Sequence, residues 1–123
     1  HGGFEVKTMG DGFMVAFASA KKGLDCAIGI QRAFAGRNES SPEPILVRIG
    51  LHTGEAIREA DDFYGRDVVL ASRIADAASG GEVLVSSALK ELTESADEFV
   101  FRDERELAMK GLTGTHRVYS VAW

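Results

Sequence analysis

Cysteine is almost missing from this sequence, since Cys26 is the single one in 123 residues. One cysteine cannot form an internal disulfide, so we expect a cytoplasmic protein, or the cytoplasmic domain of a larger one. No run of about 18 apolar residues occurs, which excludes a membrane-spanning helix within the segment. Positive charge is also scarce: 14 Lys and Arg stand against 19 Asp and Glu. The resulting net charge of -5 argues against a nucleic-acid-binding surface, which needs clustered Lys and Arg.

What is present is the composition of an ordinary globular domain. The sequence is 45% hydrophobic and 27% charged, and its length suits one hydrophobic core rather than two. We therefore treat residues 1–123 as one domain. Its beginning, His1-Gly2-Gly3, has no initiator Met and almost no lead-in to the first predicted strand. We expect the segment to belong to a longer protein.

Residues 3–17 predict a β-hairpin. Two runs of β-branched and aromatic residues flank Gly10-Asp11-Gly12, and a two-residue Asp-Gly connection between such runs is a strong hairpin signal. Glycines also permit the close approach of another backbone or of a phosphate. Asp11 is therefore a candidate metal-facing carboxylate. The alternative, that Asp-Gly stands there only because it makes favourable turns, stays open.

The remaining sequence alternates between helical and extended patterns. We expect helices over 21–35 (ended by Gly36), 66–78 and 88–94 (with Ser87 as a possible N-cap), and strands over 45–51, 55–58, 82–85, 99–102 and 116–121, with an acidic connection at 59–62. This order predicts an α+β fold with helices on one face of a mainly antiparallel sheet. His52 has no second His or Cys at metal-ligand spacing, so it is predicted to be a turn or core histidine.

Four blocks of the sequence together resemble the catalytic domain of class III adenylate and guanylate cyclases. They are 4–12 (Phe-Glu-Val-Lys-Thr-Met-Gly-Asp-Gly), 48–54 (Arg-Ile-Gly-Leu-His-Thr-Gly), 64–73 (Tyr-Gly-Arg-Asp-Val-Val-Leu-Ala-Ser-Arg) and 110–112 (Lys-Gly-Leu). The resemblance covers essentially the whole segment. It implies a ferredoxin-like core that pairs head to tail as a homodimer, with nucleotide sites at the subunit interface.

The resemblance also implies a metal site. Two aspartates of the family hold two divalent ions, Mg²⁺ or Mn²⁺. Asp11 matches the second aspartate. The first lies in an opening strand, followed by two helices, that this segment does not contain. The segment alone is therefore expected to be inactive, and either strand exchange between copies or an upstream piece would fill the slot left in the sheet.

Further residues take roles from the same resemblance. Lys7 and Asp62 match the base-recognition pair, and a Lys donor with an Asp acceptor suits adenine rather than guanine; Asp61 remains a competitor for the Asp62 role. Arg73 matches the arginine that stabilises charge on the reacting phosphate. Lys110 resembles a phosphate-binding lysine. Without the resemblance, Lys7 and Arg73 would be taken for solvated surface residues.

Val69 is a departure from the family pattern. It stands where the family usually has an Asn that orients the ribose, and valine cannot form hydrogen bonds. The expected function is that of an adenylate cyclase, which forms cyclic AMP and pyrophosphate from ATP. The alternative is a catalytically degenerate cyclase homology domain that dimerises or senses nucleotide, as Val69 would permit.

Overall fold

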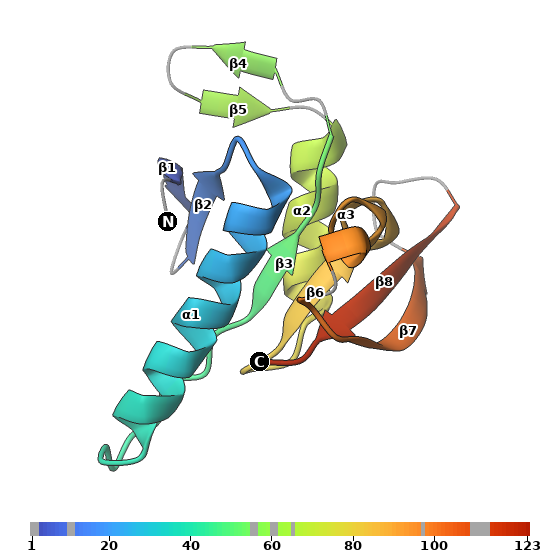
Figure 1. Cartoon of the computed structure of the whole chain (residues 1–123). Helices are drawn as coiled ribbons and strands as arrows, with labels where there is room; N and C mark the ends of the chain where they lie inside the picture. Colours follow the sequence, from blue (N-terminus) through green and yellow to red (C-terminus); the bar gives the residue numbers. More distant parts are fainter. Residues whose placement is uncertain are drawn as a thin grey trace.

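The computed structural model describes residues 3–9, 12–54, 57–59, 62–64, 66–96, 98–108 and 114–123. In chain order the elements are β1 Phe4–Met9, β2 Gly12–Ala16, α1 Ala20–Asn38, β3 Ile49–Leu51, β4 Ile57–Glu59, β5 Asp62–Tyr64, α2 Arg66–Ala77, β6 Val83–Ser86, α3 Ser87–Thr93, the short 3-10 helix η1 Glu94–Ala96, β7 Phe101–Ala108 and β8 Thr115–Val121 (Figure 1).

The described strands form three sheets. The largest has four strands in the order β3-β6-β8-β7, in which β3 runs parallel to β6 and the other pairs are antiparallel. The antiparallel pairs β1–β2 and β4–β5 each form a two-stranded sheet. The predicted α+β class, the mainly antiparallel pairing and the hairpin within 3–17 are thus confirmed. The bend of that hairpin, which includes Asp11, lies outside the described residues.

The helices cover both faces of the four-stranded sheet, so the prediction that they lie on one face is wrong. Successive side chains of a strand point to opposite faces. In β6, Val83 and Val85 join the core cluster built with α1 and α3, whereas Leu84 joins the cluster built with α2. Because all three side chains are fully buried, β6 is an interior strand that needs cover on both sides. In Figure 1, α1 and α2 accordingly flank β3 from opposite sides.

Helix α1 runs through Gly36, where the sequence predicted its end. A side chain at Gly36 would meet nothing within 4 Å, and a solvent-facing glycine inside a helix costs only about 1 kcal/mol. The helix ends at Asn38, whose side chain exchanges two hydrogen bonds with the backbone of Ile45, at 2.8 and 2.9 Å. The same bonds hold the backbone of Ile45 away from the sheet, so the strand predicted over 45–51 is shortened to β3.

Other element boundaries also differ from the prediction. The 59–62 connection is not wholly a loop, because Asp62 pairs with Glu59 in the β4–β5 ladder. The N-cap of α3 is Ser86 and not Ser87: the Ser86 Oγ accepts the hydrogen bond of the Leu89 amide. Of the predicted strand 99–102, only residues 101–102 are in a strand, and they begin the longer β7. The helix predicted over 66–78 and the strand over 116–121 are confirmed as α2 and β8.

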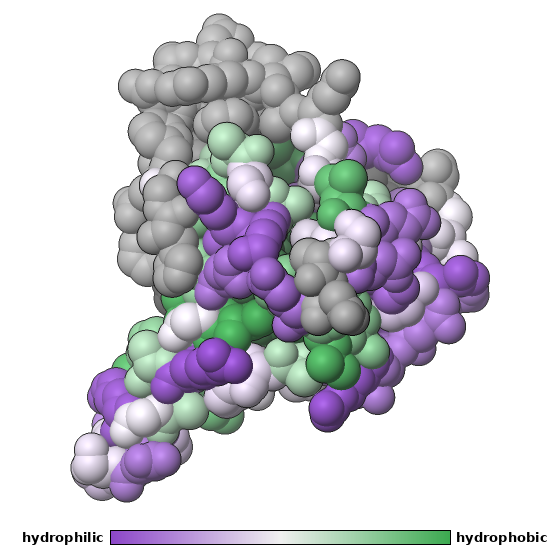
Figure 2. Space-filling model, viewed as in Figure 1, coloured by the Kyte–Doolittle hydropathy of each residue, from purple (hydrophilic) through white to green (hydrophobic). Residues whose placement is uncertain are grey.

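Strand β3 lies at one edge of the four-stranded sheet, paired with β6 alone among the described strands. The β1–β2 hairpin is not hydrogen-bonded to it. That a further strand fills this position stays a prediction. At the opposite edge the exposed surface of β7 and β8 is strongly charged, with hydrophilic residues covering this side of the molecule (Figure 2).

A half-buried ion pair joins the start of β6 to β7. Arg105 donates from both terminal nitrogens to Glu82, with Nη1 3.2 Å from Oε1 and Nη2 2.5 Å from Oε2. The Glu82 side chain is 16% exposed. Its hydrogen bonds to Arg105 lower the pKa of the Glu82 carboxyl, although burial acts in the opposite direction. Two-pronged pairing of this kind fixes geometry as well as charge.

We predict that this pair makes part of the stability dependent on pH. Because the pKa of Glu82 is lower in the folded chain than in the unfolded one, its contribution is complete above the unfolded value and disappears as the pH falls through the folded value. Glu82→Gln should therefore lower the free energy of unfolding by about 1 kcal/mol at neutral pH. Measured by urea denaturation, the difference in the free energy of unfolding between Glu82→Gln and the parent should disappear in strong acid. In a Glu82→Gln background, Arg105→Ala should lower the free energy of unfolding only slightly further. A difference between Glu82→Gln and the parent that persists in strong acid would contradict this role of the pair.

Candidate functional site

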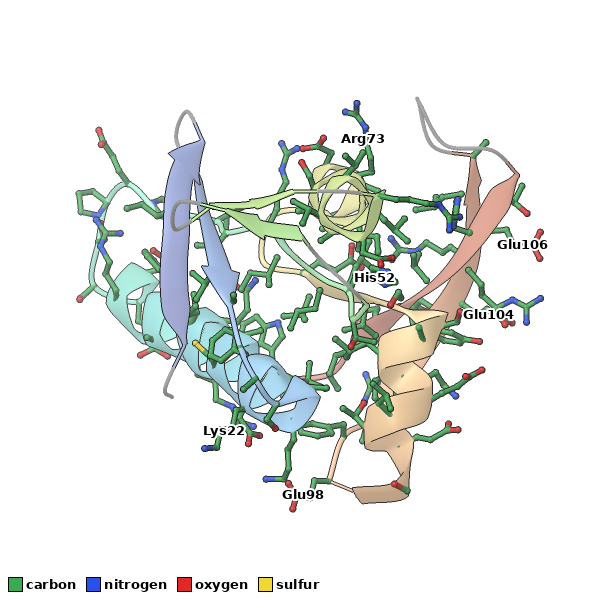
Figure 3. All side chains as sticks on the ribbon, turned by 90° about the horizontal axis from the view of Figure 1, so that it is seen from above. Lys22, His52, Arg73, Glu98, Glu104 and Glu106 are labelled. Carbon is green, nitrogen blue, oxygen red and sulfur yellow. The ribbon has the colours of Figure 1, made fainter. Side chains whose placement is uncertain are left out.

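Helix α2 carries the one predicted site residue whose side chain the structure describes. Leu70 and Ile74 face the core, while Val69 is 41% exposed on the outer surface. Arg73 is 39% exposed, and its Nη1 lies 3.7 Å from the Asp76 carboxylate one turn further on. Seen from above, Arg73 projects outward from α2, and His52 lies beneath the helix on its other side (Figure 3).

The other predicted site residues are placed only in part. Lys7 lies in β1 and Asp62 in β5, but their side chains are outside the described part of the structure. Asp11, Asp61 and Lys110 lie outside the described residues altogether. The strands β1 and β5, which carry Lys7 and Asp62, are in contact with one another. The backbone thus brings the two base-recognition candidates into the same region of one chain.

A chain of hydrogen bonds lies under α2 and links three elements. His52, just after β3, has its Nε2 2.7 Å from Asp67 Oδ1 in the first turn of α2. Its Nδ1 is 2.7 Å from Ser86 Oγ, at the end of β6. The His52 side chain is 8% exposed and Ser86 is 5% exposed, so the bond between them is shielded from water, whereas the Asp67 side chain is 32% exposed. The prediction of a core histidine at this position is confirmed.

The hydrogen-bond donors and acceptors of His52, Asp67 and Ser86 can be paired so that none is left without a partner. Ser86 Oγ accepts from the Leu89 amide at 3.2 Å, and its own hydrogen is then available for His52 Nδ1. A carboxylate only accepts, so His52 Nε2 must carry the hydrogen that meets Asp67. Every group is satisfied when Nε2 carries a hydrogen toward Asp67 and one hydrogen lies between Nδ1 and Ser86 Oγ. The first turns of α2 and α3 are thereby joined through one ring.

The arrangement is not a hydrolytic serine site, although Ser, His and Asp are in line. The Ser86 hydroxyl is buried and already caps α3, so it cannot reach a substrate carbonyl. The imidazole offers Nδ1 to the serine and Nε2 to the aspartate, the reverse of the serine protease arrangement. The role of these hydrogen bonds is therefore structural: they join the end of β3 to the first turn of α2 and to the beginning of α3.

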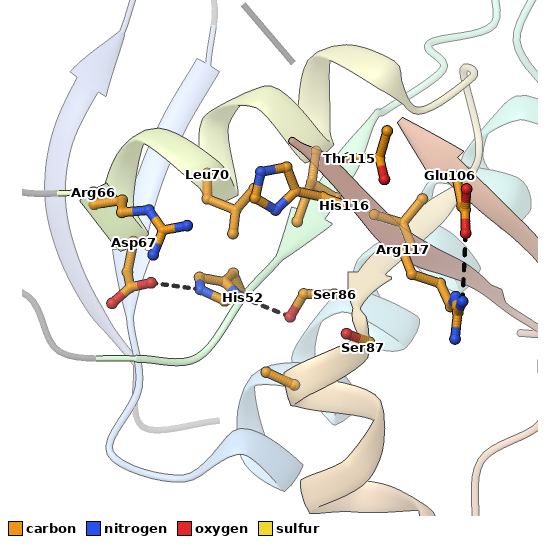
Figure 4. A pocket seen from close by; sticks show the side chains of 13 residues that line it. His52, Arg66, Asp67, Leu70, Ser86, Ser87, Glu106, Thr115, His116 and Arg117 are labelled. Carbon is orange, nitrogen blue, oxygen red and sulfur yellow. Dashed lines mark hydrogen bonds and ion pairs between the residues drawn. The ribbon is translucent and has the colours of Figure 1, made fainter. Parts of the chain in front are cut away.

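A cavity of about 430 Å³ opens beside this chain, between α2 and β8 (Figure 4). Its wall includes His52, Asp67, His116 and Arg117. His116 Nε2 is buried and has no hydrogen-bond partner among the described residues. Arg117 is paired with Glu106, at 3.4 Å. The charged groups here are balanced in sign, and Arg73 does not line the cavity.

Metal ligands are not gathered in the part of the chain that the structure describes, where no group of three or more His, Cys, Asp or Glu side chains is placed to hold an ion. The residue on which the metal prediction rests, Asp11, is outside that part.

No described helix combines the length and apolar character needed to cross a membrane.

Sequence reasoning missed the link from His52 to Asp67 and Ser86. The partners lie 15 and 34 residues away, on separate elements, and no short motif connects them. The available signals were local ones: a polar His-Thr-Gly after an apolar strand, and an Asp in the first turn of a helix.

Comparisons with known proteins agree on one family. The family described as the adenylate and guanylate cyclase catalytic domain matches residues 1–122. A putative adenylate cyclase of Rhizobium meliloti is 34% identical over 105 residues, which cover 84% of this chain and 18% of that protein. An adenylate cyclase of Podospora anserina is 36% identical over 111 residues, and these cover 70% of this chain and 5% of that protein. The chain thus spans a small part of these relatives.

A solved structure extends the agreement to the fold. The structure described as an adenylate/guanylate cyclase/hydrolase from Silicibacter pomeroyi superimposes with a TM-score of 0.89 at 33% identity. The match covers 98% of this chain and 72% of that one. The predicted cyclase fold is confirmed by this likeness.

We predict that Ser86 contributes much more to stability than its neighbour Ser87. Ser86→Ala removes both the cap of α3 and the partner of His52, and should lower the free energy of unfolding by roughly 1–3 kcal/mol. Ser87→Ala, which removes neither bond, is the matched control and should stay within about 0.5 kcal/mol of the parent. Urea denaturation of both variants checks this. Equal losses would show that the hydrogen-bond chain adds nothing.

Proposed function

The chain belongs to the adenylate and guanylate cyclase catalytic domain family, and we propose that its activity is that of an adenylate cyclase, which forms cyclic AMP and pyrophosphate from ATP. The observation that carries this proposal is Arg73. It stands on the outer surface of α2, at the family position for the arginine that acts on the reacting phosphate, and is exposed enough to meet a ligand.

In the proposed reaction, the 3′-oxygen of the ribose forms a bond to the α-phosphorus. The bond from that phosphorus to the oxygen bridging to the β-phosphate breaks, and pyrophosphate leaves with its electron pair. Arg73 donates to the reacting phosphate and stabilises the charge that develops there. Guanidinium suits this role because it is planar and permanently charged.

Catalytic domains of this family are generally metal-dependent, and here Asp11 is the proposed ligand. Its carboxylate has the hard oxygen donors that Mg²⁺ and Mn²⁺ prefer. Asp11, together with an aspartate at the family's first metal position, would hold two such ions, whose chemistry would be to ease ionisation of the 3′-hydroxyl and to neutralise charge on the triphosphate. Lys110 would add a positive charge near the phosphates.

The proposed base is adenine. Lys7 can donate to a ring nitrogen of adenine and Asp62 can accept from its exocyclic amine. The contact between β1 and β5 supports a joint role for the two residues. The two relatives compared above carry adenylate cyclase names, which favours the same substrate.

The proposed active unit is a head-to-tail homodimer. Arg73 and Val69 would face a cleft completed by the metal-binding Asp11 of the second copy. Both residues are exposed on α2, as an interface position in the free chain requires. Each site would then take its metal ligands from one subunit and its base-recognition pair from the other.

Val69 favours a second candidate function. It is exposed on α2 at the position where an Asn would orient the ribose, and it offers no hydrogen bond there. Loss of one positioned donor in a transition-state site costs on the order of 100- to 1000-fold in rate. A catalytically degenerate domain that binds nucleotide or only dimerises is therefore the alternative.

The test of the activity uses the full-length protein that contains this chain. We predict cyclic AMP formation from ATP with Mn²⁺ or Mg²⁺, and a fall on the order of 100- to 1000-fold in kcat for Arg73→Ala. Asp11→Ala should abolish turnover. The isolated 123-residue segment is expected to be inactive. If the full-length protein binds ATP and yields no cyclic AMP with either metal, the degenerate domain becomes the function.

We also predict that Lys7 sets the choice of base. Lys7→Glu places an acceptor where adenine needs a donor, so it should lower kcat/KM for ATP and raise it for GTP. Lys7→Gln, which keeps a donor and removes the charge, is the control and should change the ratio less. An ATP/GTP ratio that Lys7→Glu leaves unchanged would remove Lys7 from base recognition.

A further inference from the structure

Helix α2 packs against β3 and the residues that follow it through two contacts of different kinds. Toward the end of the helix, Gly50 of β3 lies so close to Ala75 that a methyl group on Gly50 would overlap the Ala75 backbone nitrogen. At the beginning of the helix, the His52 imidazole holds the Asp67 carboxylate at 2.7 Å. Arg73 lies between these two points along α2.

The first turn of α2 has no buried apolar residue of its own. Its buried ridge begins at Leu70, which is 7% exposed, and continues with the fully buried Ile74. Asp67 stands three residues before Leu70 and seven before Ile74, so it extends the same ridge by one turn. The hydrogen bond to His52 thus occupies the place of a missing apolar contact. Besides this bond, the first turn has only the half-buried Val68 as an apolar contact group.

The surroundings of Asp67 are shaped for this bond. A methyl group at Gly54 would overlap the Asp67 carboxylate, so only glycine leaves the carboxylate in place. On the other side of the ring, Ser86 fixes the imidazole by its bond to Nδ1 at 2.7 Å. The ring is therefore held from two directions and cannot turn away from Asp67 without losing a buried partner.

We propose that His52 is a positioning residue for catalysis: by holding Asp67 it sets how far α2 is rolled on β3, and so where Arg73 points. This inference rests on the proposed cyclase function. Arg73 projects from the side of α2 opposite His52 (Figure 3), so a roll of the helix moves the guanidinium along an arc. A misplacement of about 1 Å at a reacting centre can cost on the order of 100-fold in rate.

The test is a double-mutant cycle in the full-length protein. His52→Ala and Asp67→Ala should each lower kcat by about 10- to 100-fold, with a smaller change in the KM for ATP. In an Arg73→Ala background neither should cause further loss, because the group that they position is gone. Asp67→Asn, whose amide oxygen still accepts from Nε2, should retain most of the activity.

Arg105→Ala is the matched control for general destabilisation. It removes a half-buried polar pair whose arginine lies on β7, outside the hydrogen bonds that join His52 to Asp67 and Ser86, so it should lower the melting temperature and leave kcat unchanged. If His52→Ala does not fold, Gly54→Ala takes its place, because it displaces the carboxylate and removes no hydrogen-bonding group. Wild-type kcat in Asp67→Ala, or equal losses with and without Arg73, would overturn the proposal.

A wild-type protein without turnover would count against the proposed function and not against this inference. Crystal structures of the wild type and of Asp67→Ala then decide the matter. A shifted first turn of α2 with a displaced Arg73 guanidinium would support the positioning role. An unmoved helix would overturn it.

Discussion

The hydrogen bond between His52 and Asp67 is the constraint on which the placement of α2 depends. The helix has an apolar ridge and a close glycine contact along its length, but its first turn has no buried apolar residue and is joined to His52 by the Asp67 carboxylate. A buried polar link is directional, so it sets orientation in a way that apolar burial does not. It is also costly to break, because the His52 imidazole, 8% exposed, would then be buried without this partner, although the Asp67 carboxylate is 32% exposed.

This constraint has consequences on both sides of the helix. Beneath α2, the bond connects through Ser86 to the cap of α3, so two helices on opposite faces of the sheet share one network. Above α2, the outer surface displays Arg73 and Val69. The fold thus separates an inner face, built from packing and hydrogen bonds, from an outer face on which Val69 and Arg73 are exposed.

Much of the fold could be predicted from sequence because its signals are local. The Asp-Gly bend predicted the β1–β2 hairpin, and the apolar spacing in 66–78 predicted α2. The errors came from contacts distant in sequence. Helix α1 continues past Gly36 to Asn38, whose side chain bonds the backbone of Ile45. The apolar run of β6 indicates a buried strand, but it does not tell which helices cover each face. Lys7, Asp62, Arg73 and Lys110 became site candidates only through the family resemblance, whereas Asp11 was already a candidate from its place between two glycines of the predicted bend.

The protonation of His52 tests this account most directly. Long-range ¹H–¹⁵N correlation spectra of the imidazole at neutral pH distinguish a protonated from an unprotonated ring nitrogen. The hydrogen bond to the carboxylate predicts a hydrogen on Nε2, facing Asp67. A ring protonated on Nδ1 alone would contradict it, because Nε2 and the carboxylate would then be two acceptors with no hydrogen between them.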